Sequence, residues 1–255
     1  MKHEPPATNT LGSVENVFDI INYIQQQDGA GVTEIAAELG YAKSTIHSYL
    51  TTMNECGYLI NEGDQYRLSL EFLAHGIHRR ERILAWETVG PILRQLADET
   101  AEAVWFTVEE DGRVRNLYKC SGERAIALDT TVGRSMPIHA LAAGKAILST
   151  MPSDRAESIM AEHELTELTT NTITSTEQLR SELEKTRERG FAIDNEEHRI
   201  GLRSVAVPLE VNRDTFGAIV VSGPANRIKD EMLHEEIPDL VLGAVNELEL
   251  RLQLE

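Results

Sequence analysis

The sequence has very little cysteine and no long apolar run. Only Cys56 and Cys120 occur in 255 residues, so one chain can build neither a disulfide framework nor a four-cysteine zinc site. No apolar run approaches the ~20 residues that cross a bilayer. The first ten residues, MKHEPPATNT, lack the apolar core of a secretory signal. We therefore expect a cytoplasmic protein with no membrane partner.

Lysine is also scarce. Six lysines and 18 arginines face 42 acidic residues, which gives a formal net charge of −18. Such a surface repels phosphate, and this alone argues against a nucleic-acid partner. Few lysines among many carboxylates are also typical of halophilic proteins, because molar salt screens charges within ~3 Å. A merely acidic protein from a low-salt cell is the alternative. If the protein is halophilic, its acidity reflects the habitat and does not exclude DNA.

Residues 1–69 have the pattern of a winged helix-turn-helix. Ser13 precedes an amphipathic run that includes Val14 and Ile24, and a second short helix is expected from Thr33 to Gly40. A third helix is expected from Ser44 to about residue 55. Two β-prone runs, 58–61 and 65–69, flank a glycine turn and predict a hairpin. Three helices and a hairpin in this order predict a winged helix.

Residues 70–90 predict a linker helix. Leu70, Leu73, Ile77 and Leu84 stand at heptad-like spacing on it. This apolar seam fits pairing with a second chain, and it fits equally well packing against the helix's own domain.

Residues 91–255 predict a second domain of the α+β class. Strands are expected at 103–108, 114–119, 125–128, 191–194, 205–209 and 216–222. Helices are expected around residues 92–96, 139–149, 153–162 and 176–189 and at the C-terminus, where Pro238 kinks or restarts the helix.

The third helix of the first domain has a polar face made of small side chains. Ile46, Leu50 and Met53 fall on one side of this helix, and polar residues fall on the other. Hydroxyl and imidazole groups can enter a major groove without steric hindrance, and the helix N-terminus can bind phosphate. Any solvated helix has a polar face, and residues 1–80 carry five basic against ten acidic residues. The face alone is therefore weak evidence for DNA binding.

Two clusters in the second domain could belong to a ligand site or to an enzyme. The small residues Ala140, Ala142, Ala143 and Gly144 open a helix, so they allow either an anionic ligand near free amides or close helix packing. Possible catalytic groups are His139, Lys145, Ser149, Asp194, Glu196, Glu197 and His198. The sequence has no G-x-S-x-G, G-x-G-x-x-G or P-loop motif, and no second ligand pair at metal spacing. We expect no enzyme, no cofactor and no metal.

Four stretches together resemble the IclR family of transcription regulators. They are K-S-T-I-H-S-Y-L at 43–50, G-R-S-M-P-I-H-A-L-A-A-G-K-A-I-L-S at 133–149, R-G-F-A-I-D-N-E-E-H-R-I-G-L-R-S-V-A-V-P-L at 189–209 and A-I-V-V-S-G-P-A-N-R-I at 218–228. They follow the family's order and spacing, and the resemblance covers residues 11–254. It implies a winged helix, a dimerising linker helix and a GAF-like domain that binds a small effector.

The resemblance also implies site residues. We expect Lys43, Ser44, Thr45, His47, Ser48 and Thr51 to touch DNA, with Arg67 of the wing on a phosphate. The implied effector-binding residues are Ala142, Ala143, Asp194, Ser204 and Ser222. Ser48 stands where members often have arginine, and Ser204 where they usually have cysteine. Ala142 replaces a frequent glycine and Val220 a residue that can be serine, so the effector cannot be copied from a relative.

The leading hypothesis is therefore a ligand-responsive, one-component transcription regulator that acts as a homodimer or tetramer on double-stranded operator DNA. The expected effector is a small carboxylate, a sugar acid or an aromatic compound. The alternatives are a small-molecule sensor or scaffold that binds no DNA, and an enzyme that acts on a small acid.

Overall fold

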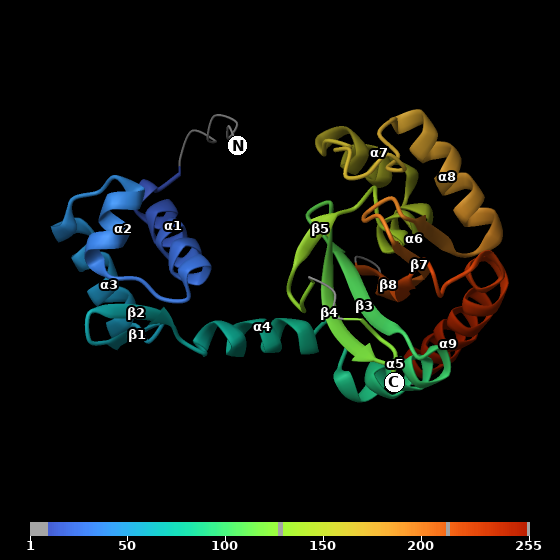
Figure 1. The fold of residues 1–255 in the computed structure, drawn as a ribbon, viewed down its shortest axis with the longest axis horizontal. Helices are drawn as coiled ribbons and strands as arrows, with labels where there is room; N and C mark the ends of the chain where they lie inside the picture. Colours follow the sequence, from blue (N-terminus) through green and yellow to red (C-terminus); the bar gives the residue numbers. More distant parts are fainter. Residues whose placement is uncertain (1–9, 127–129, 213–214, 254–255) are drawn as a thin grey trace. The chain divides into compact units, whose positions relative to one another are not determined.

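The computed structural model describes residues 10–126, 130–212 and 215–253, and these form two compact units that divide between Arg79 and Arg80 (Figure 1). Each unit has its own hydrophobic core. Among the described residues, no helix is long and apolar enough to cross a membrane.

The first unit is a three-helix bundle followed by a two-stranded wing. Its elements are α1 (Gly12–Gln27), α2 (Val32–Leu39), α3 (Lys43–Glu55), β1 (Leu59–Glu62) and β2 (Gln65–Leu68). Gly40 ends α2 with φ +74, a left-handed conformation that starts the tight turn into α3. The strands pair antiparallel, as predicted. Ser13 does not cap α1, because the helix begins at Gly12 and Leu11 is its N-cap.

Helix α3 packs its apolar side against the core of the first unit and leaves its polar side outward. Ile46, Leu50 and Met53 are buried, together with apolar side chains of α1, α2 and the wing. Asn16 of α1 accepts a hydrogen bond from the Tyr41 hydroxyl at 2.6 Å and donates one to the Tyr49 hydroxyl at 3.2 Å. These bonds tie α1 to the helix-turn-helix.

The predicted single helix over residues 70–90 is wrong, because the structure has two. Helix α4 covers Glu71–Glu81, residues 82–85 break the helix, and α5 covers Trp86–Thr100. Leu84 lies in the break and is buried in the core of the second unit, so it does not continue the α4 seam. Leu70 and Leu73 are 78% and 56% exposed. At its start α4 is anchored to the wing region, where the Tyr58 hydroxyl lies 2.8 Å from His75 Nε2.

The second unit is built on a six-stranded antiparallel sheet. The strands are β3 (Ala103–Glu110), β4 (Arg113–Ser121), β5 (Ser135–Pro137), β6 (Ala192–Asn195), β7 (Leu202–Asn212) and β8 (Thr215–Pro224). Their order is β5-β4-β3-β8-β7-β6. The short edge strand β5 was not predicted. The strand expected at 125–128 is absent at Ala125 and Ile126, and its other residues lie outside the described part of the chain.

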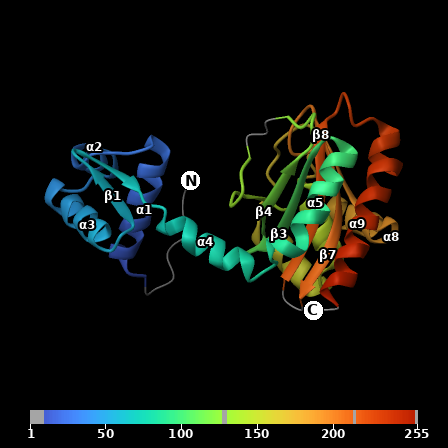
Figure 2. The same ribbon diagram turned by 90° about the horizontal axis from the view of Figure 1, so that it is seen from below.

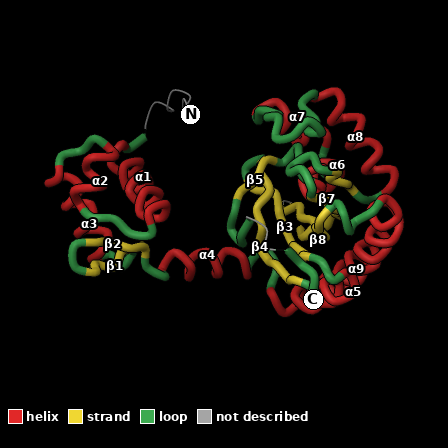
Figure 3. The backbone as a smooth tube through the Cα atoms, viewed as in Figure 1, coloured by secondary structure: helices red, strands yellow, loops and turns green. Residues whose placement is uncertain are grey.

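Helices cover both faces of this sheet (Figures 1 and 2). One face carries α6 (Ala142–Thr150), α7 (Ser153–Glu162) and α8 (Thr176–Arg189), and the other carries α5 and α9 (Ile237–Leu252). A π-helical turn (Met232–Glu236) precedes α9, and Pro238 restarts the helix in its first turn. Period-two alternation along β3 places Phe106 in the α5 and α9 core and Trp105 in the α6 core. Figure 3 shows helices flanking the strands throughout this unit.

Candidate functional site

Helix α3 presents a continuous polar surface. Lys43, Ser44, Thr45, His47 and Ser48 are exposed, and Thr51 is half-buried. The Ser48 hydroxyl donates to the Ser44 carbonyl at 3.0 Å, and Thr51 Oγ1 lies 3.5 Å from His47 Nδ1. The structure therefore brings the six predicted α3 residues together on one helix, with short side chains that leave its surface accessible.

A groove runs beside His47 in the first unit. Its walls come from the start of α2 and from the wing: Gly31, Val32, Thr33, Glu34, Asn61, Gly63, Asp64, Gln65 and Tyr66. Glu34 Oε2 accepts a hydrogen bond from the Gly31 amide at 2.8 Å, so this amide at the start of α2 is already paired. A phosphate in this groove would meet two carboxylates, Glu34 and Asp64.

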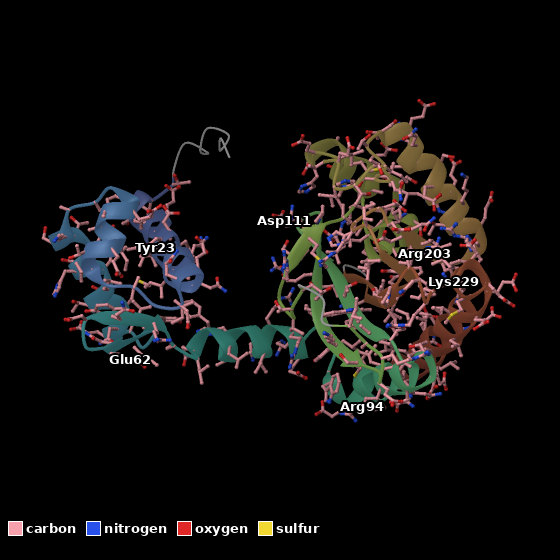
Figure 4. All side chains as sticks on the ribbon, in the orientation of Figure 1. Tyr23, Glu62, Arg94, Asp111, Arg203 and Lys229 are labelled. Atoms are coloured by element: carbon pink, nitrogen blue, oxygen red, sulfur yellow. The ribbon has the colours of Figure 1, made fainter. Side chains whose placement is uncertain are left out.

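Arg67 of the wing is not free in this structure. Its Nη1 lies 3.4 Å from Asp28 Oδ1, and its Nε lies 3.0 Å from Oε2 of Glu62, which is labelled in Figure 4. The side chain is 45% exposed. A phosphate bound to Arg67 would therefore compete with these two carboxylates for its guanidinium.

A pocket of about 70 Å³ opens on the α6 side of the sheet in the second unit. Its lining comes from the sheet, from the start of α6 and from segments beside them: Trp105, Thr107, Val114, Asn116, Thr130, Met136, Leu141, Ala142, Ala143, Asp194, His198, Arg199, Leu202, Ser204, Val220 and Ser222. The five effector-binding residues implied by the resemblance, Ala142, Ala143, Asp194, Ser204 and Ser222, all belong to it. A buried water needs 10–15 Å³, so the pocket has room for several waters or a small organic molecule.

The polar wall of the pocket centres on Asp194 at the end of β6. Its Oδ1 accepts the amides of Glu197 at 2.8 Å and His198 at 3.3 Å. Burial raises the pKa of Asp194 to about 7, although the nearby Lys145 ammonium opposes the rise. The hydroxyls of Ser204 and Ser222 lie 2.9 Å apart on the neighbouring strands β7 and β8. Near neutral pH this wall therefore offers hydroxyls and a carboxyl that is partly protonated.

The opposite wall is the start of α6. Its N-cap, Leu141, makes no side-chain capping bond, so the amides of the first turn lack that partner. Arg199 also lines the pocket. Burial lowers the pKa of His198, and the neighbouring Arg134 and Arg199 lower it further, which disfavours the charged form of the imidazole. The first-turn amides, the helix dipole and the Arg199 guanidinium together favour an anion.

The small residues at the start of α6 have two different roles. Ala142 and Ala143 line the pocket, whereas Gly144 serves helix packing. A Cβ on Gly144 would lie 1.7 Å from the carbonyl oxygen of Ile138. The run of small residues therefore borders the pocket at Ala142 and Ala143 and allows close packing at Gly144, while ligand binding there stays a prediction.

We expect Gly144→Ala to destabilise the second unit by ~1–3 kcal/mol or more. This is the usual cost of overpacking, and the backbone of Ile138 cannot move aside as a flexible side chain could. Gly243→Ala is the matched control, since Gly243 lies on α9 with nothing within 4 Å of its Cβ position. Alanine there should leave the protein as stable or slightly more stable. Thermal unfolding of both variants tests this, and equal melting temperatures would contradict the assignment.

The groups that suggested an enzyme do not form a catalytic arrangement. Ser149 donates to the Ala146 carbonyl at 2.7 Å, and His139 Nε2 lies 3.0 Å from the Thr166 carbonyl. The Lys145 ammonium forms a buried ion pair with Glu197, which lies 52 residues further along the chain. No hydrogen bond joins His139, Lys145 and Ser149 to one another among the described residues, and these residues hold no cluster suited to a metal.

Several pocket residues were not predicted. Trp105, Asn116 and Met136 reach it from β3, β4 and β5, and Arg199 reaches it from the turn after β6. Met136 and Arg199 lie inside the stretches that carry the family resemblance, so position offered a signal for them. Trp105 and Asn116 lie on strands outside those stretches, and only the pairing of β3 with β4 brings them to the site.

A winged helix in one unit and a small-molecule pocket in the other define the class of a one-component transcription regulator. Comparison with known families agrees with this class. Residues 81–248 match the model of the bacterial transcriptional regulator IclR C-terminal domain, and residues 13–62 match the IclR helix-turn-helix domain.

Full-length relatives cover both parts. The Probable HTH-type transcriptional regulator ArcR of Halobacterium salinarum is 31% identical over 98% of this chain and 99% of its own. The crystal structure of IclR from Thermotoga maritima superposes with a TM-score of 0.80 at 26% identity, covering 95% of this chain and 99% of that one. An IclR homologue from Microbacterium hydrocarbonoxydans, complexed with 4-hydroxybenzoate, has the same fold, with a TM-score of 0.80 at 18% identity over 95% and 99% of the two chains.

The chain belongs to the IclR family of transcriptional regulators. It is a DNA-binding transcription regulator with an effector-binding domain, and it is not an enzyme.

Proposed function

We propose that the protein is a homodimeric regulator in the cytoplasm whose pocket binds a small carboxylate with an apolar body, and that this binding changes its affinity for an operator. The observation that carries the proposal is the convergence of the uncapped start of α6, Arg199 and the five implied residues on one pocket. The roles follow the chain: DNA binding by residues 1–69, linkage and dimerisation by 70–90, and effector binding by 91–255.

The chemistry of the pocket supports this effector class. The first-turn amides of α6 and the guanidinium of Arg199, from the turn after β6, suit a carboxylate. Trp105, Met136 and Val220 provide an apolar surface for the rest of the molecule. The 4-hydroxybenzoate in the Microbacterium homologue is an aromatic acid of this kind. Hydroxyls of Ser204 and Ser222 and the Asp194 carboxyl would bind a hydroxyl of an aromatic or sugar acid.

The DNA contacts are proposed for Lys43, Ser44, Thr45, His47, Ser48 and Thr51, with Arg67 on a phosphate. Leu70, just before α4, and Leu73 and Ile77 on α4 are exposed and support pairing with a second copy, because covering apolar side chains at this spacing is favourable. A tetramer would add a second pairing of such dimers.

Salt adaptation is a further part of the proposal. The net charge of −18 with six lysines supports a molar-salt cytoplasm, and the similarity to the Halobacterium regulator fits it. Few cations face the DNA, so counterion release contributes little to binding. We expect operator affinity to depend weakly on KCl or to increase with it.

The test is fluorescence anisotropy of labelled DNA from upstream of the protein's own gene, in molar KCl, with a panel of small carboxylates, sugar acids and 4-hydroxybenzoate. We expect sequence-specific binding that one of them changes by roughly 5- to 150-fold, and a thermal shift with the same compound. Ala143→Leu fills the pocket and should keep operator binding while losing the response. Effector binding without any DNA affinity would instead support the sensor or scaffold.

A further inference from the structure

Strand β4 contains one extra residue where it passes the pocket. Phe106 of β3 pairs with Tyr118, but the next residue, Thr107, pairs with Asn116. Leu117 is therefore a β-bulge. Without it, Asn116 and Tyr118 would point to the same face of the sheet. With it, Asn116 lines the pocket, and Leu117 and Tyr118 pack in the core formed with α5 and α9.

On the pocket side, Asn116 organises the segment that follows β4. Its Nδ2 donates to Thr130 Oγ1 at 3.1 Å and to the Thr131 carbonyl at 3.5 Å. Its backbone carbonyl accepts the Gly133 amide at 2.7 Å, and its own amide donates to the Arg134 carbonyl at 3.3 Å. A ligand that displaces Thr130 would therefore also displace Asn116 and the neighbouring bulge.

On the opposite face, Tyr118 holds the joint between α4 and α5. Its hydroxyl lies 2.9 Å from both Glu81 Oε1 and the Leu84 carbonyl and shares its proton between them. The other oxygen of Glu81 accepts the Trp86 amide at 3.2 Å, which caps the start of α5. The Arg80 guanidinium lies 4.4 Å from the centre of the Tyr118 ring, and the Trp86 ring lies 5.1 Å away. The last turn of α4 thus rests on Tyr118.

We propose that Tyr118 is the positioning residue that couples the effector pocket to α4. The Leu117 bulge links Asn116, on the pocket side, to Tyr118, which hydrogen-bonds Glu81 on the other side, so the two residues move together. The inference deepens the proposed function, on which its biological meaning rests. Helix α4 leads to the DNA-binding unit, so a change at the joint would alter how the two winged helices of a dimer are presented. Coupling of this kind is reciprocal, so operator binding would also change the pocket.

The two tryptophans of the chain allow a test that needs no effector and no DNA. Trp105 lies in the pocket and Trp86 at the joint, so Trp105→Phe leaves Trp86 as the sole reporter of the joint. In this background Asn116→Ala perturbs the pocket side of the bulge. Ser222→Ala is the matched control, since it removes a pocket hydroxyl from β8, which is not a neighbour of β4 in the sheet. Trp86 emission and its acrylamide quenching are measured for each variant.

We expect Asn116→Ala to change Trp86 quenching and Ser222→Ala to leave it unchanged. Combining Asn116→Ala with Tyr118→Phe, which keeps the ring and removes the hydroxyl, should reduce the effect of Asn116→Ala to less than half. The non-additivity of this double-mutant cycle is the direct measure of coupling. Equal effects of Asn116→Ala with and without the Tyr118 hydroxyl would overturn the proposal, and so would equal effects of Asn116→Ala and Ser222→Ala.

The same cycle read by operator affinity separates this inference from the proposed function. If Asn116→Ala changes operator affinity only while the Tyr118 hydroxyl is present, the coupling reaches the DNA. A fluorescence cycle that shows coupling in a protein without operator binding keeps the inference about the joint and refutes the proposed function. A protein that binds the operator but shows an additive fluorescence cycle keeps the proposed function and refutes the inference about the joint.

Discussion

Ser44→Glu should lower operator affinity by roughly 100-fold or more. Ser44 is exposed in the first turn of α3, so glutamate there would place a carboxylate on the surface proposed to meet phosphates and base edges. A negative side chain in the first turn of a helix stabilises that helix. The variant should therefore fold at least as well as the wild type, and fluorescence anisotropy with operator DNA should detect the loss.

Ser44→Gln separates charge from size. Glutamine has the same length as glutamate and no charge, so most operator affinity should return. Circular dichroism and light scattering check that both variants keep the helix content and the oligomeric state of the wild type. A Ser44→Glu protein that binds the operator normally would exclude the start of α3 from the DNA interface.

Asp194→Asn should stabilise the second unit at neutral and higher pH. The Asp194 carboxyl has a folded pKa of about 7 against an ordinary value of 3.8, because burial disfavours its charge. Below pH 4 it is protonated in both states and costs nothing. As the pH rises from about 4 to about 7, the unfolded chain releases the proton and the folded one keeps it, so stability falls. The full difference corresponds to about 4 kcal/mol, which asparagine removes.

Urea unfolding followed by tryptophan fluorescence measures this effect, since Trp86 and Trp105 both lie in the second unit. The wild type should lose stability between pH 4 and 7, and Asp194→Asn should show a flatter profile. Some slope should remain, because burial also raises the pKa of Glu197 despite its ion pair with Lys145. Glu210→Gln, which removes an exposed carboxyl from β7, should keep the wild-type profile. Identical profiles for Asp194→Asn and the wild type would show that Asp194 is ionised in the folded protein.

Local sequence patterns predicted most of the elements. The apolar run of β3, which is buried on both faces, and the helical periodicity of α3 were sufficient, because both patterns follow directly from burial. The break between α4 and α5 was missed, because Leu84 continues the spacing of Leu73 and Ile77. At this break, Glu81 and the Leu84 carbonyl accept hydrogen bonds from Tyr118, a tertiary contact that spacing along the chain does not encode. The short edge strand β5 was missed because three residues carry no periodicity.

The site was predictable only in part, for a similar reason. The family motifs supplied Ala143, Asp194 and Ser222, and the structure places them in one pocket. The ion pair of Lys145 with Glu197 depends on where α6 packs over the turn after β6, which spacing along the chain does not encode. The opposite roles of Asn116 and Tyr118 depend on a single bulge, and the strand pattern alone would have placed both on one face.

The ion pairs of Arg67 have a consequence for the solution around the DNA. If Arg67 turns from Asp28 and Glu62 to a DNA phosphate, both carboxylates face the solvent without their cation. The two carboxylates would then bind potassium ions while the duplex releases its own. Complex formation would change the number of bound ions very little, so operator affinity would vary little with salt concentration, as the proposed salt adaptation requires.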